Sequence, residues 1–583
     1  MHFKVLKMSV YKLLEPHWKS LYSDTEPELL KDFVRELEQI RESINFQPHP
    51  QEWYKDAVVY SLYVELFAGD FQKLTSKLDY LSDLGVSCLW LLPILDSPMR
   101  DGGFDIRNYR MIRSELTGLP ADAPEEKHLD VFRHFLDEAH KRDIRVIFDI
   151  AINHTSDQHP WFQEAKKSKE SPYRDYYIWS KDTSLYKEAR IIFEGLCTSN
   201  WEKSGDEYYF HRFFEFQPDL NYRNPRVLLE MTRNFIFWLR MGVDGFRADA
   251  IPYLWKEEGT TCENHPMLHH IIRFFRTVLE YLRPSTLLLA EACQKPKEVV
   301  RYFGDGDECN AGYHFPLMPQ IYKAVAAESS QPVQNILSRE VTPAIPENAQ
   351  WFTFLRCHDE LSLELVYVSE EDRKYIHDHY CKKPEWDFRQ GQGISARLAD
   401  LMDRDPDKIS LAFSIMLTLP GTPVVYYGDE FGKTNDEEFY RKMIRHTGKD
   451  DTRFLVRGEV DWQQLETELK KPGSYTSVIY NKVRNMLHVR NRFHCFGRGE
   501  INWLKAQDTN GLPAGNILAF ERKWQQERIL VVHNLSPGEF WIHLPQAATR
   551  SFNDLLGNSI IQGKEAGYLM IKPWQYLWID KTK

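Results

Sequence analysis

The sequence predicts an α/β protein built on a (β/α)₈ barrel, with helices before it, an inserted subdomain after its third strand and an antiparallel β-domain at its C-terminus. Three observations carry this prediction. Short apolar segments alternate with amphipathic helices from Asp56 onward, about 90 residues separate Ile150 from Val243, and the pattern changes to short β runs after about Glu500. A chain of 583 residues is also too long for one ordinary core.

The eight predicted strands share a short apolar core bounded by turn residues. They are residues 57–64, 87–93, 145–150, 243–249, 286–292, 311–316, 351–357 and 423–427. The pattern is weakest near residue 311. Eight strands with helices between them fit a closed barrel, whose active sites lie where the strands end.

The remaining segments differ from the barrel pattern. Residues from about 9 to 45 carry apolar positions at helical spacing, which predicts two amphipathic helices packed on a larger body, with partner binding as the alternative. The long gap after the third strand, polar and aromatic from Ser171 to Tyr209, predicts an inserted subdomain. Residues from about 364 to 409 are charged and predicted to be helical.

These patterns set the predicted domain limits. They are 1–50 for the helical extension, 51–154 with 225–495 for the barrel, 155–224 for the insertion and 496–583 for the β-domain. The extension also offers a surface for forming a homo-oligomer, although nothing in its pattern requires one.

Composition excludes some partners. The formal net charge is −11 with acidic and basic residues well mixed, which argues against nucleic acid and against an anionic membrane surface. The eight cysteines are scattered without CxxC spacing, so free thiols in a reducing compartment are expected. The N-terminus lacks the features of a signal peptide and no run approaches a transmembrane span, so we expect a cytoplasmic protein.

Polar side chains follow four of the predicted strands. They are Asp149, Asn153 and His154 at the third, Arg247 and Asp249 at the fourth, Glu291 at the fifth, and His358 and Asp359 at the seventh. Because barrel strands end at one mouth, these residues are expected to cluster there as a catalytic set. A single aspartate at a strand end is more often a cap or a loop anchor, so the prediction depends on the combination.

The spacing suggests which carboxyl group is the nucleophile and which is the general acid. Arg247 and Asp249 are two residues apart, so both point to the same face of an extended strand. The guanidinium is expected to hold Asp249 ionised, as a nucleophile requires. Glu291 follows an apolar strand, and partial burial would keep it protonated, as an acid requires.

Four motifs resemble the four sequence regions of the α-amylase superfamily, and a fifth resembles its fifth region. They are DIAINH (149–154), GFRADA (245–250), AEA (290–292) and CHDE (357–360), followed by QPDLN (217–221). The resemblance covers roughly residues 53–430. Longer runs at 153–165, 208–222, 258–266, 308–321 and 358–366 are similar to those of trehalose synthases.

The resemblance implies retaining glycoside chemistry that needs no cofactor. Asp249 would attack the anomeric carbon and form a β-glucosyl-enzyme, while Glu291 would act as general acid and then as general base. Asp359 would bind the 2- and 3-hydroxyls of the distorted ring. The sugar-binding residues implied are Asp101, Phe104, His154, Gln217, Arg247, His358, Glu360 and Arg190. Asp101 would grip the 4- and 6-hydroxyls of a terminal glucose, and Arg190 would pair with Glu360 to close the pocket.

A structural calcium ion is the one metal that the resemblance suggests. Asn153 and Asp219 match positions that supply calcium ligands in many relatives, and their oxygen atoms suit that ion. An ordinary hydrogen bond between the two loops is the alternative. The separate DxNxDG calcium loop is absent, because the chain runs ELFAGDFQKL at 65–74.

The sequence departs from trehalose synthases around the leaving sugar. Phe104 stands at a tyrosine position, and Cys293 and Cys357 stand at asparagine positions, where a thiol bonds more weakly than an amide. After residues 424–432, the segment KTNDEEFYRKMIRHTGKDD replaces the usual one. The acceptor side of the pocket is therefore expected to differ from that of trehalose synthases.

The resemblance favours α-glucosyl transfer on maltose-sized sugars, with maltose and trehalose interconverted and some hydrolysis. The alternatives are an α-glucosidase or α-amylase-type hydrolase, and a transglucosylase acting on sucrose. A non-catalytic sugar-binding barrel is the alternative from another class. All three carboxyl groups are present, which argues against it.

Overall fold

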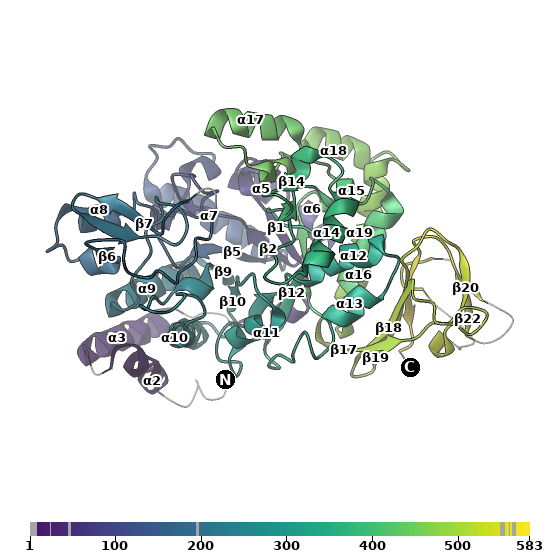
Figure 1. The fold of residues 1–583 in the computed structure, drawn as a ribbon, viewed down its shortest axis with the longest axis horizontal. Helices are drawn as coiled ribbons and strands as arrows, with labels where there is room; N and C mark the ends of the chain where they lie inside the picture. The colour runs from purple at the N-terminus through teal and green to yellow at the C-terminus, as the bar shows by residue number, and fades with distance from the viewer. Residues whose placement is uncertain are drawn as a thin grey trace.

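The computed structural model describes residues 9–23, 25–44, 48–193, 197–547, 554–558, 560–562 and 567–582. The first eight residues, where no signal peptide was predicted, lie outside these ranges. At the centre of the molecule is a closed barrel of eight strands in which every neighbouring pair is parallel (Figure 1). The predicted fold class is confirmed.

All eight barrel strands fall within or beside their predicted ranges. They are β1 (Val59–Leu62), β2 (Cys88–Leu91), β5 (Arg145–Ala151), β9 (Gly245–Asp249), β10 (Leu287–Ala290), β11 (Ala311–Tyr313), β12 (Gln350–Phe354) and β16 (Thr422–Tyr426). Most are shorter than predicted, because apolar residues continue into the loops at the barrel mouth.

The register between strands sets the geometry of that mouth. Asp149 on β5 pairs with Arg247 on β9, and Ala248 on β9 pairs with Ala290, the last residue of β10. A Cβ atom at Gly245 would lie 2.5 Å from Cβ of Leu287, so the glycine permits the close approach of these strands. Residues just beyond the ends of β5, β9 and β10 therefore face one another.

Two N-terminal helices cover one outer helix of the barrel. α2 (Val10–Tyr22) and α3 (Pro27–Ser43) bury the apolar faces predicted for them and pack against α10 (Pro266–Leu282) (Figure 1). Tyr22 also donates a hydrogen bond of 2.9 Å to the carbonyl of Tyr222. Packing on a larger body is thus observed for these helices.

The insertion between β5 and β9 is folded. It contains α8 (Pro160–Lys167) and a three-stranded antiparallel sheet in the order β6-β8-β7 (Trp179–Ser180, Glu207–Phe210 and Trp201–Ser204). α9 (Pro225–Met241) then leads back to the barrel.

The predicted helical stretch at 364–409 is only partly correct. α14 (Glu370–Tyr380) and the short α15 (Leu398–Leu401) are helical, but the residues between them form the strands β14 (Asp387–Phe388) and β15 (Gly393–Ile394). With β13 (Leu361–Ser362) they make a small antiparallel sheet. Strands of two residues are too short to leave a periodic signal.

The segment that follows β16 also crosses the barrel mouth. It contains α17 (Glu437–Thr447) and a 3₁₀ helix, η8 (Thr452–Val456), which contact each other.

The C-terminal part forms two antiparallel sheets with a core of their own. The first is β17-β18-β19-β23 (Glu500–Leu504, Ile517–Trp524, Glu527–Asn534 and Tyr576–Asp580). The second is β20-β22-β21 (Phe540–His543, Tyr568–Ile571 and Ile561–Gln562). This part lies on the opposite side of the barrel from the insertion (Figure 1). The domain limits drawn from the sequence remain a prediction.

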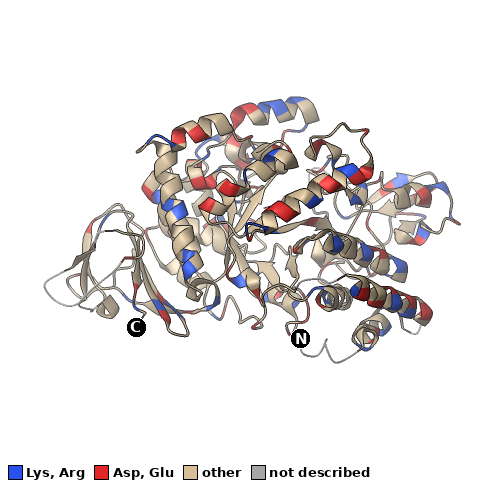
Figure 2. Cartoon of the chain, turned by 180° about the vertical axis from the view of Figure 1, so that it is seen from behind, with Lys and Arg blue, Asp and Glu red and all other residues tan. Residues whose placement is uncertain are grey.

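The surface fits the mixed charge of the sequence. Basic and acidic residues are interspersed along the outer helices of the face drawn in Figure 2. Across the described ranges, no helix has both the length and the apolar character that crossing a bilayer demands.

Candidate active site

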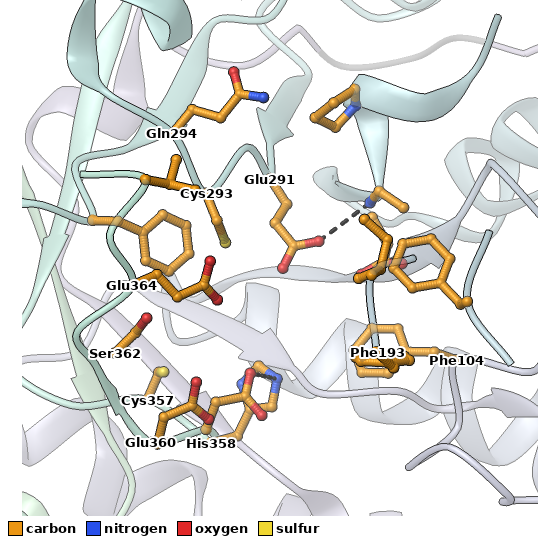
Figure 3. Close-up of a pocket in the computed structure, with 18 of the residues that line it drawn as sticks. Phe104, Phe193, Glu291, Cys293, Gln294, Cys357, His358, Glu360, Ser362 and Glu364 are labelled. Carbon is orange, nitrogen blue, oxygen red and sulfur yellow. Dashed lines mark hydrogen bonds and ion pairs between the residues drawn. The ribbon is translucent and has the colours of Figure 1, made fainter. Parts of the chain in front are cut away.

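A cavity of about 590 Å³ opens at the barrel mouth, where the strand ends meet the insertion and the segments after β12 and β16. Ten of the predicted site residues line it: Asp101, Phe104, His154, Arg190, Arg247, Asp249, Glu291, His358, Asp359 and Glu360. Gln217 lies directly behind Asp101, whereas Asn153 and Asp219 lie outside the cavity wall. Figure 3 shows Glu291 pointing into the cavity opposite Glu360, Glu364 and His358.

Arg247 gathers three carboxyl groups at the floor of this cavity. Its Nη1 lies 2.8 Å from Asp149 Oδ1 and 2.9 Å from Asp249 Oδ1, and its Nη2 pairs with Glu291 Oε1. The backbone N–H of Ala250 donates to Glu291 Oε2 at 3.2 Å. The strand register described above therefore brings Asp249 and Glu291 to one guanidinium.

Asp249 has a raised pKa, whereas the sequence predicted an ionised carboxylate. Burial and the neighbouring Glu291 raise the pKa of the Asp249 carboxyl well above its usual range, despite Arg247. The prediction that Arg247 holds Asp249 ionised is wrong, because that guanidinium is shared among several carboxyl groups. Burial also raises the pKa of Asp149 to about 7.

Asp359 lies in the opposite environment. Its Oδ1 is 2.8 Å from Arg457 Nη2 and 3.2 Å from Arg453 Nη1, and its Oδ2 is 3.2 Å from His358 Nε2. Burial opposes ionisation, but His358 and the two arginines outweigh it and hold the pKa of Asp359 well below its usual range. This carboxyl group is ionised at any physiological pH.

Arg453 and Arg457 are functional candidates that sequence reasoning missed. Both come from η8 or its C-terminal end, just after the segment flagged as a departure from the family pattern. That unusual segment was the available signal. The sequence did not show that this segment would reach Asp359, because the path of a loop across the barrel mouth depends on tertiary packing.

Asp101, Gln217, His154 and Phe104 form a connected group on another side of the cavity. Gln217 Nε2 donates to Asp101 Oδ2 at 2.9 Å and lies 3.3 Å from His154 Nε2. The other contact of His154 Nε2 is the Phe104 carbonyl, also at 3.3 Å. The Phe104 ring lies nearly parallel to His358, with ring centres 6.3 Å apart. Burial raises the pKa of Asp101 and lowers that of His154.

The predicted ion pair between Arg190 and Glu360 is not formed. Arg190 Nε instead pairs with Glu263 Oε1 at 2.8 Å, and Arg212 pairs with the same carboxyl group. Among the described residues, Glu360 makes no ion pair within 4 Å, and burial together with Asp359 raises its pKa to about 7. Glu263 lies in a run singled out for its family resemblance, but its pairing could not be predicted from that.

The residues expected to hold calcium do not fit that ion. The buried ammonium of Lys256 lies 2.7 Å from Asn153 Oδ1 and 2.8 Å from Asp219 Oδ2. Calcium prefers six to eight oxygen ligands, whereas here a positive side chain already bridges the two oxygens. Lys256 was not recognised from the sequence, since a lone lysine after a strand is ordinarily a surface residue.

Both unusual cysteines line the cavity. Cys293 is exposed to it and Cys357 is half-buried, with both sulfur atoms on the wall that also carries Glu360 and Glu364 (Figure 3). The protein wall that screens Cys293 from bulk water, together with Glu291, raises the pKa of its thiol well above the usual range, and burial raises that of Cys357 to about 12. The thiols therefore stay protonated and bond only weakly to a sugar.

Comparison with known proteins agrees with this geometry. The family model of the α-amylase catalytic domain matches residues 33–384, and that of the maltogenic amylase C-terminal domain matches residues 511–578. The chain is 40% identical over 528 residues to the trehalose synthase/amylase of Mycolicibacterium smegmatis, covering 84% of this chain and 85% of that protein. It is 40% identical over 526 residues to the trehalose synthase of Pimelobacter sp., covering 83% and 87%.

Solved structures share the fold across most of the chain. The α-amylase from H. orenii superimposes with a TM-score of 0.68 at 26% identity, covering 90% of this chain and 99% of that one. The isomaltulose synthase from Klebsiella sp. LX3 gives a TM-score of 0.67 at 25% identity, covering 91% and 100%.

Proposed function

Because the chain belongs to the α-amylase family, we propose that it transfers α-glucosyl groups with retention of configuration and interconverts maltose and trehalose, with some hydrolysis. The observation that carries this proposal is the meeting of Asp249, Glu291 and Asp359 in one cavity. The similarity to trehalose synthases over most of both chains supports the choice of sugars.

Asp249 and Glu291 are proposed as nucleophile and general acid/base. A retaining enzyme needs one proton on this pair: the acid protonates the leaving oxygen while the ionised partner attacks the anomeric carbon. The raised pKa of Asp249 supports a proton on this pair, since burial and the neighbouring Glu291 favour the neutral form there. The choice of Asp249 as nucleophile and Glu291 as acid follows the match of GFRADA and AEA to the family motifs. Once Glu291 carries that proton, Asp249 is the ionised member, and its bond to C1 gives a β-glucosyl-enzyme.

Asp359 is proposed to bind the ring hydroxyls without attacking. Its low pKa keeps it a pure acceptor, and Arg453 and Arg457 fix its orientation. Asp101 with Gln217 would bind the far end of the ring, and His154, His358 and Phe104 would line it. A pocket closed at that end would favour short substrates with a terminal glucose.

The acceptor side is proposed to decide between isomerisation and hydrolysis. Maltose becomes trehalose if the released glucose turns and is recaptured by the glucosyl-enzyme while water is excluded. Cys293 and Cys357 offer the released sugar only weak hydrogen bonds, which would let it turn but would also let it leave. Glu360 and Glu364, on the same wall, would be its stronger partners.

The setting of the reaction is proposed to be the cytoplasm, since all eight cysteines are free thiols in the structure. We propose that catalysis uses neither a metal nor a cofactor, because the two carboxyl groups and the arginine cluster supply the acid, the base and the charge that the reaction needs. A sugar is the expected partner.

The test is incubation of the purified full chain with maltose, trehalose or sucrose, followed by chromatography of the products. Trehalose from maltose and maltose from trehalose are the expected results, with a smaller yield of glucose. Glucose alone would replace the proposal with a hydrolase, and turnover of sucrose with a sucrose-acting enzyme. NMR of the first product formed should show the α-anomer, and a β-anomer would contradict retention.

A further inference from the structure

Three side chains with different metal-binding atoms meet beside the cavity, outside the catalytic set. They are His377 near the end of α14, Cys381 at the residue that caps this helix, and Asp387 at the start of β14. Their imidazole nitrogen, thiol sulfur and carboxylate oxygen all lie within 4.8 Å of one another. All three are half-buried, so an ion from solvent can reach them.

The backbone holds these side chains toward a common point. His377 and Cys381 are four residues apart and share one face of the helix end, where the Cys381 N–H donates to the His377 carbonyl at 2.8 Å. Asp387 faces them, with its Oδ1 2.8 Å from His377 Nε2. The same oxygen accepts a hydrogen bond from the Gly391 N–H at 2.8 Å, which orients the carboxylate as outer contacts orient metal ligands.

The lysines beside the cluster are paired with other groups. Lys382 pairs with Asp403, and Lys383 Nζ lies 2.9 Å from Glu437 Oε1. The nearby Arg373 donates to the carbonyls of Gly391 and Gln390, away from the three ligand atoms.

A second cluster with the same three residue types offers a useful contrast. Cys357, His358 and Asp359 also lie within 4.8 Å of one another, but Asp359 is already paired with Arg453 and Arg457. A metal ion there would have to displace two arginines. The cluster on α14 and β14 carries no such pairing in the described residues, since the one ion pair of Asp387 is with His377.

We propose that His377, Cys381 and Asp387 bind one zinc-class divalent metal ion, with water as its fourth ligand. A nitrogen, a sulfur and an oxygen ligand suit zinc, whereas calcium and magnesium prefer oxygen alone. Tetrahedral binding sets these atoms roughly 3.2–3.8 Å apart, which small rotations of half-exposed side chains provide. On binding, the S–H bond of Cys381 breaks, a sulfur–metal bond forms and the proton passes to solvent, with no change of oxidation state.

The position of the site gives the ion a structural role. β13, β14 and β15 are two residues long, and so small a sheet is weakly held by its own hydrogen bonds. A metal bridge would tie the end of α14 to β14. Phe388 and Arg389, which follow Asp387 directly, line the active-site cavity, so the bridge would stiffen that wall.

Metal titration of the full chain tests the proposal independently of its activity. After treatment with EDTA, the protein is titrated with ZnCl₂ by calorimetry and with CoCl₂ by visible absorption. One equivalent should bind at this site, and cobalt should show a thiolate charge-transfer band. Cys381→Ser should abolish the band, and both it and His377→Ala should weaken zinc binding at least tenfold.

The matched control is Cys357→Ser, which should keep the cobalt band and zinc binding. Zinc should raise the Tm of the wild type and of this control but not that of Cys381→Ser. Asp387→Asn gives an independent variant should His377→Ala be unstable. A wild type without the band, a band lost in Cys357→Ser but kept in Cys381→Ser, or a zinc-dependent Tm in Cys381→Ser would each overturn the proposal.

Discussion

Two sides of the active-site cavity shift the pKa of a carboxyl group in opposite directions. At the floor, the single guanidinium of Arg247 contacts three carboxyl groups, and the pKa of Asp249 is raised. On the opposite wall, Arg453 and Arg457 pair with Asp359, although Arg453 also pairs with Asp451, and the pKa of Asp359 is lowered. Asp249 is buried and Asp359 is half-buried, so exposure and the balance of neighbouring charges together decide which carboxyl group keeps a proton. That difference suits a mechanism that moves one proton at the floor and none at the wall.

The largest expected effect comes from removing the proposed nucleophile. Asp249→Ala should lower kcat on maltose by about 10⁴-fold or more, because no other group can form the glucosyl-enzyme. The Tm and the far-UV spectrum should stay close to those of the wild type. Asp79→Ala, an exposed residue paired with Arg142, is the control and should keep full activity. Turnover retained in Asp249→Ala would refute the proposed floor chemistry.

Removing one of the two arginines that pair with Asp359 should have the next largest effect. Arg457→Ala should lower kcat/KM by about 10²-fold, as loss of a positioned donor typically does. The pKa of Asp359 should rise toward its usual range, because one of its two neighbouring arginines is removed. Arg457→Lys keeps the charge and should restore most of the lost kcat/KM.

The surface variant Arg441→Ala, from the ion pair with Glu437 on α17, controls for changes elsewhere in the same segment. A kcat/KM that is identical in wild type and Arg457→Ala would show that Arg457 does not position Asp359 for the substrate.

A buried carboxyl group with no cation beside it extends the comparison. Burial raises the pKa of Glu430 to about 7, although Tyr60 and Tyr80 donate hydrogen bonds to it at 2.7 and 2.9 Å. Its folded-state pKa exceeds its unfolded value, so its contribution to stability is fully present below about pH 4 and is lost as pH rises through 7.

Glu430→Gln should therefore flatten the decline in unfolding free energy between about pH 4 and 7, by up to about 3 kcal/mol. Denaturant unfolding at several pH values measures this slope. Equal slopes in wild type and variant would show that burial alone does not raise the pKa of Glu430.

The smallest expected effect lies on the acceptor wall. Cys293→Asn should raise the ratio of trehalose to glucose formed from maltose by about two- to fivefold, because an amide holds the released sugar more strongly than a thiol. Cys293→Ser, with a hydroxyl and a similar volume, should give an intermediate ratio. Product ratios at low conversion provide the measurement, and an unchanged ratio in both variants would remove Cys293 from the acceptor site.

The fold was predictable because barrel strands carry a strong signal. Most of the eight have an apolar run of about four or more residues, the exceptions being 243–249 and 311–316, and a (β/α)₈ barrel then assigns catalytic residues to the strand ends. Asp249 and Glu291 could be found this way, since Asp249 is the last residue of β9 and Glu291 follows the last residue of β10.

Residues on the connecting segments could not be predicted in the same way. Arg457, Glu263 and Lys256 reach their partners through loops whose paths are set by packing between distant parts of the chain. The predicted pairing of Arg190 with Glu360 failed for that reason. The small sheet of β13, β14 and β15 was missed because two-residue strands leave no pattern.

The cover that α2 and α3 place on α10 also limits where the chain can be cut. In a bare barrel the outer face of α10 would meet water, but here nearly every residue from Phe274 to Leu282 is buried. α10 connects the two strands that carry Asp249 and Glu291. Proteolysis or truncation beyond Tyr22 would therefore expose the apolar surface of α10 directly behind the catalytic strands. The shortened protein should aggregate before its activity can be assayed.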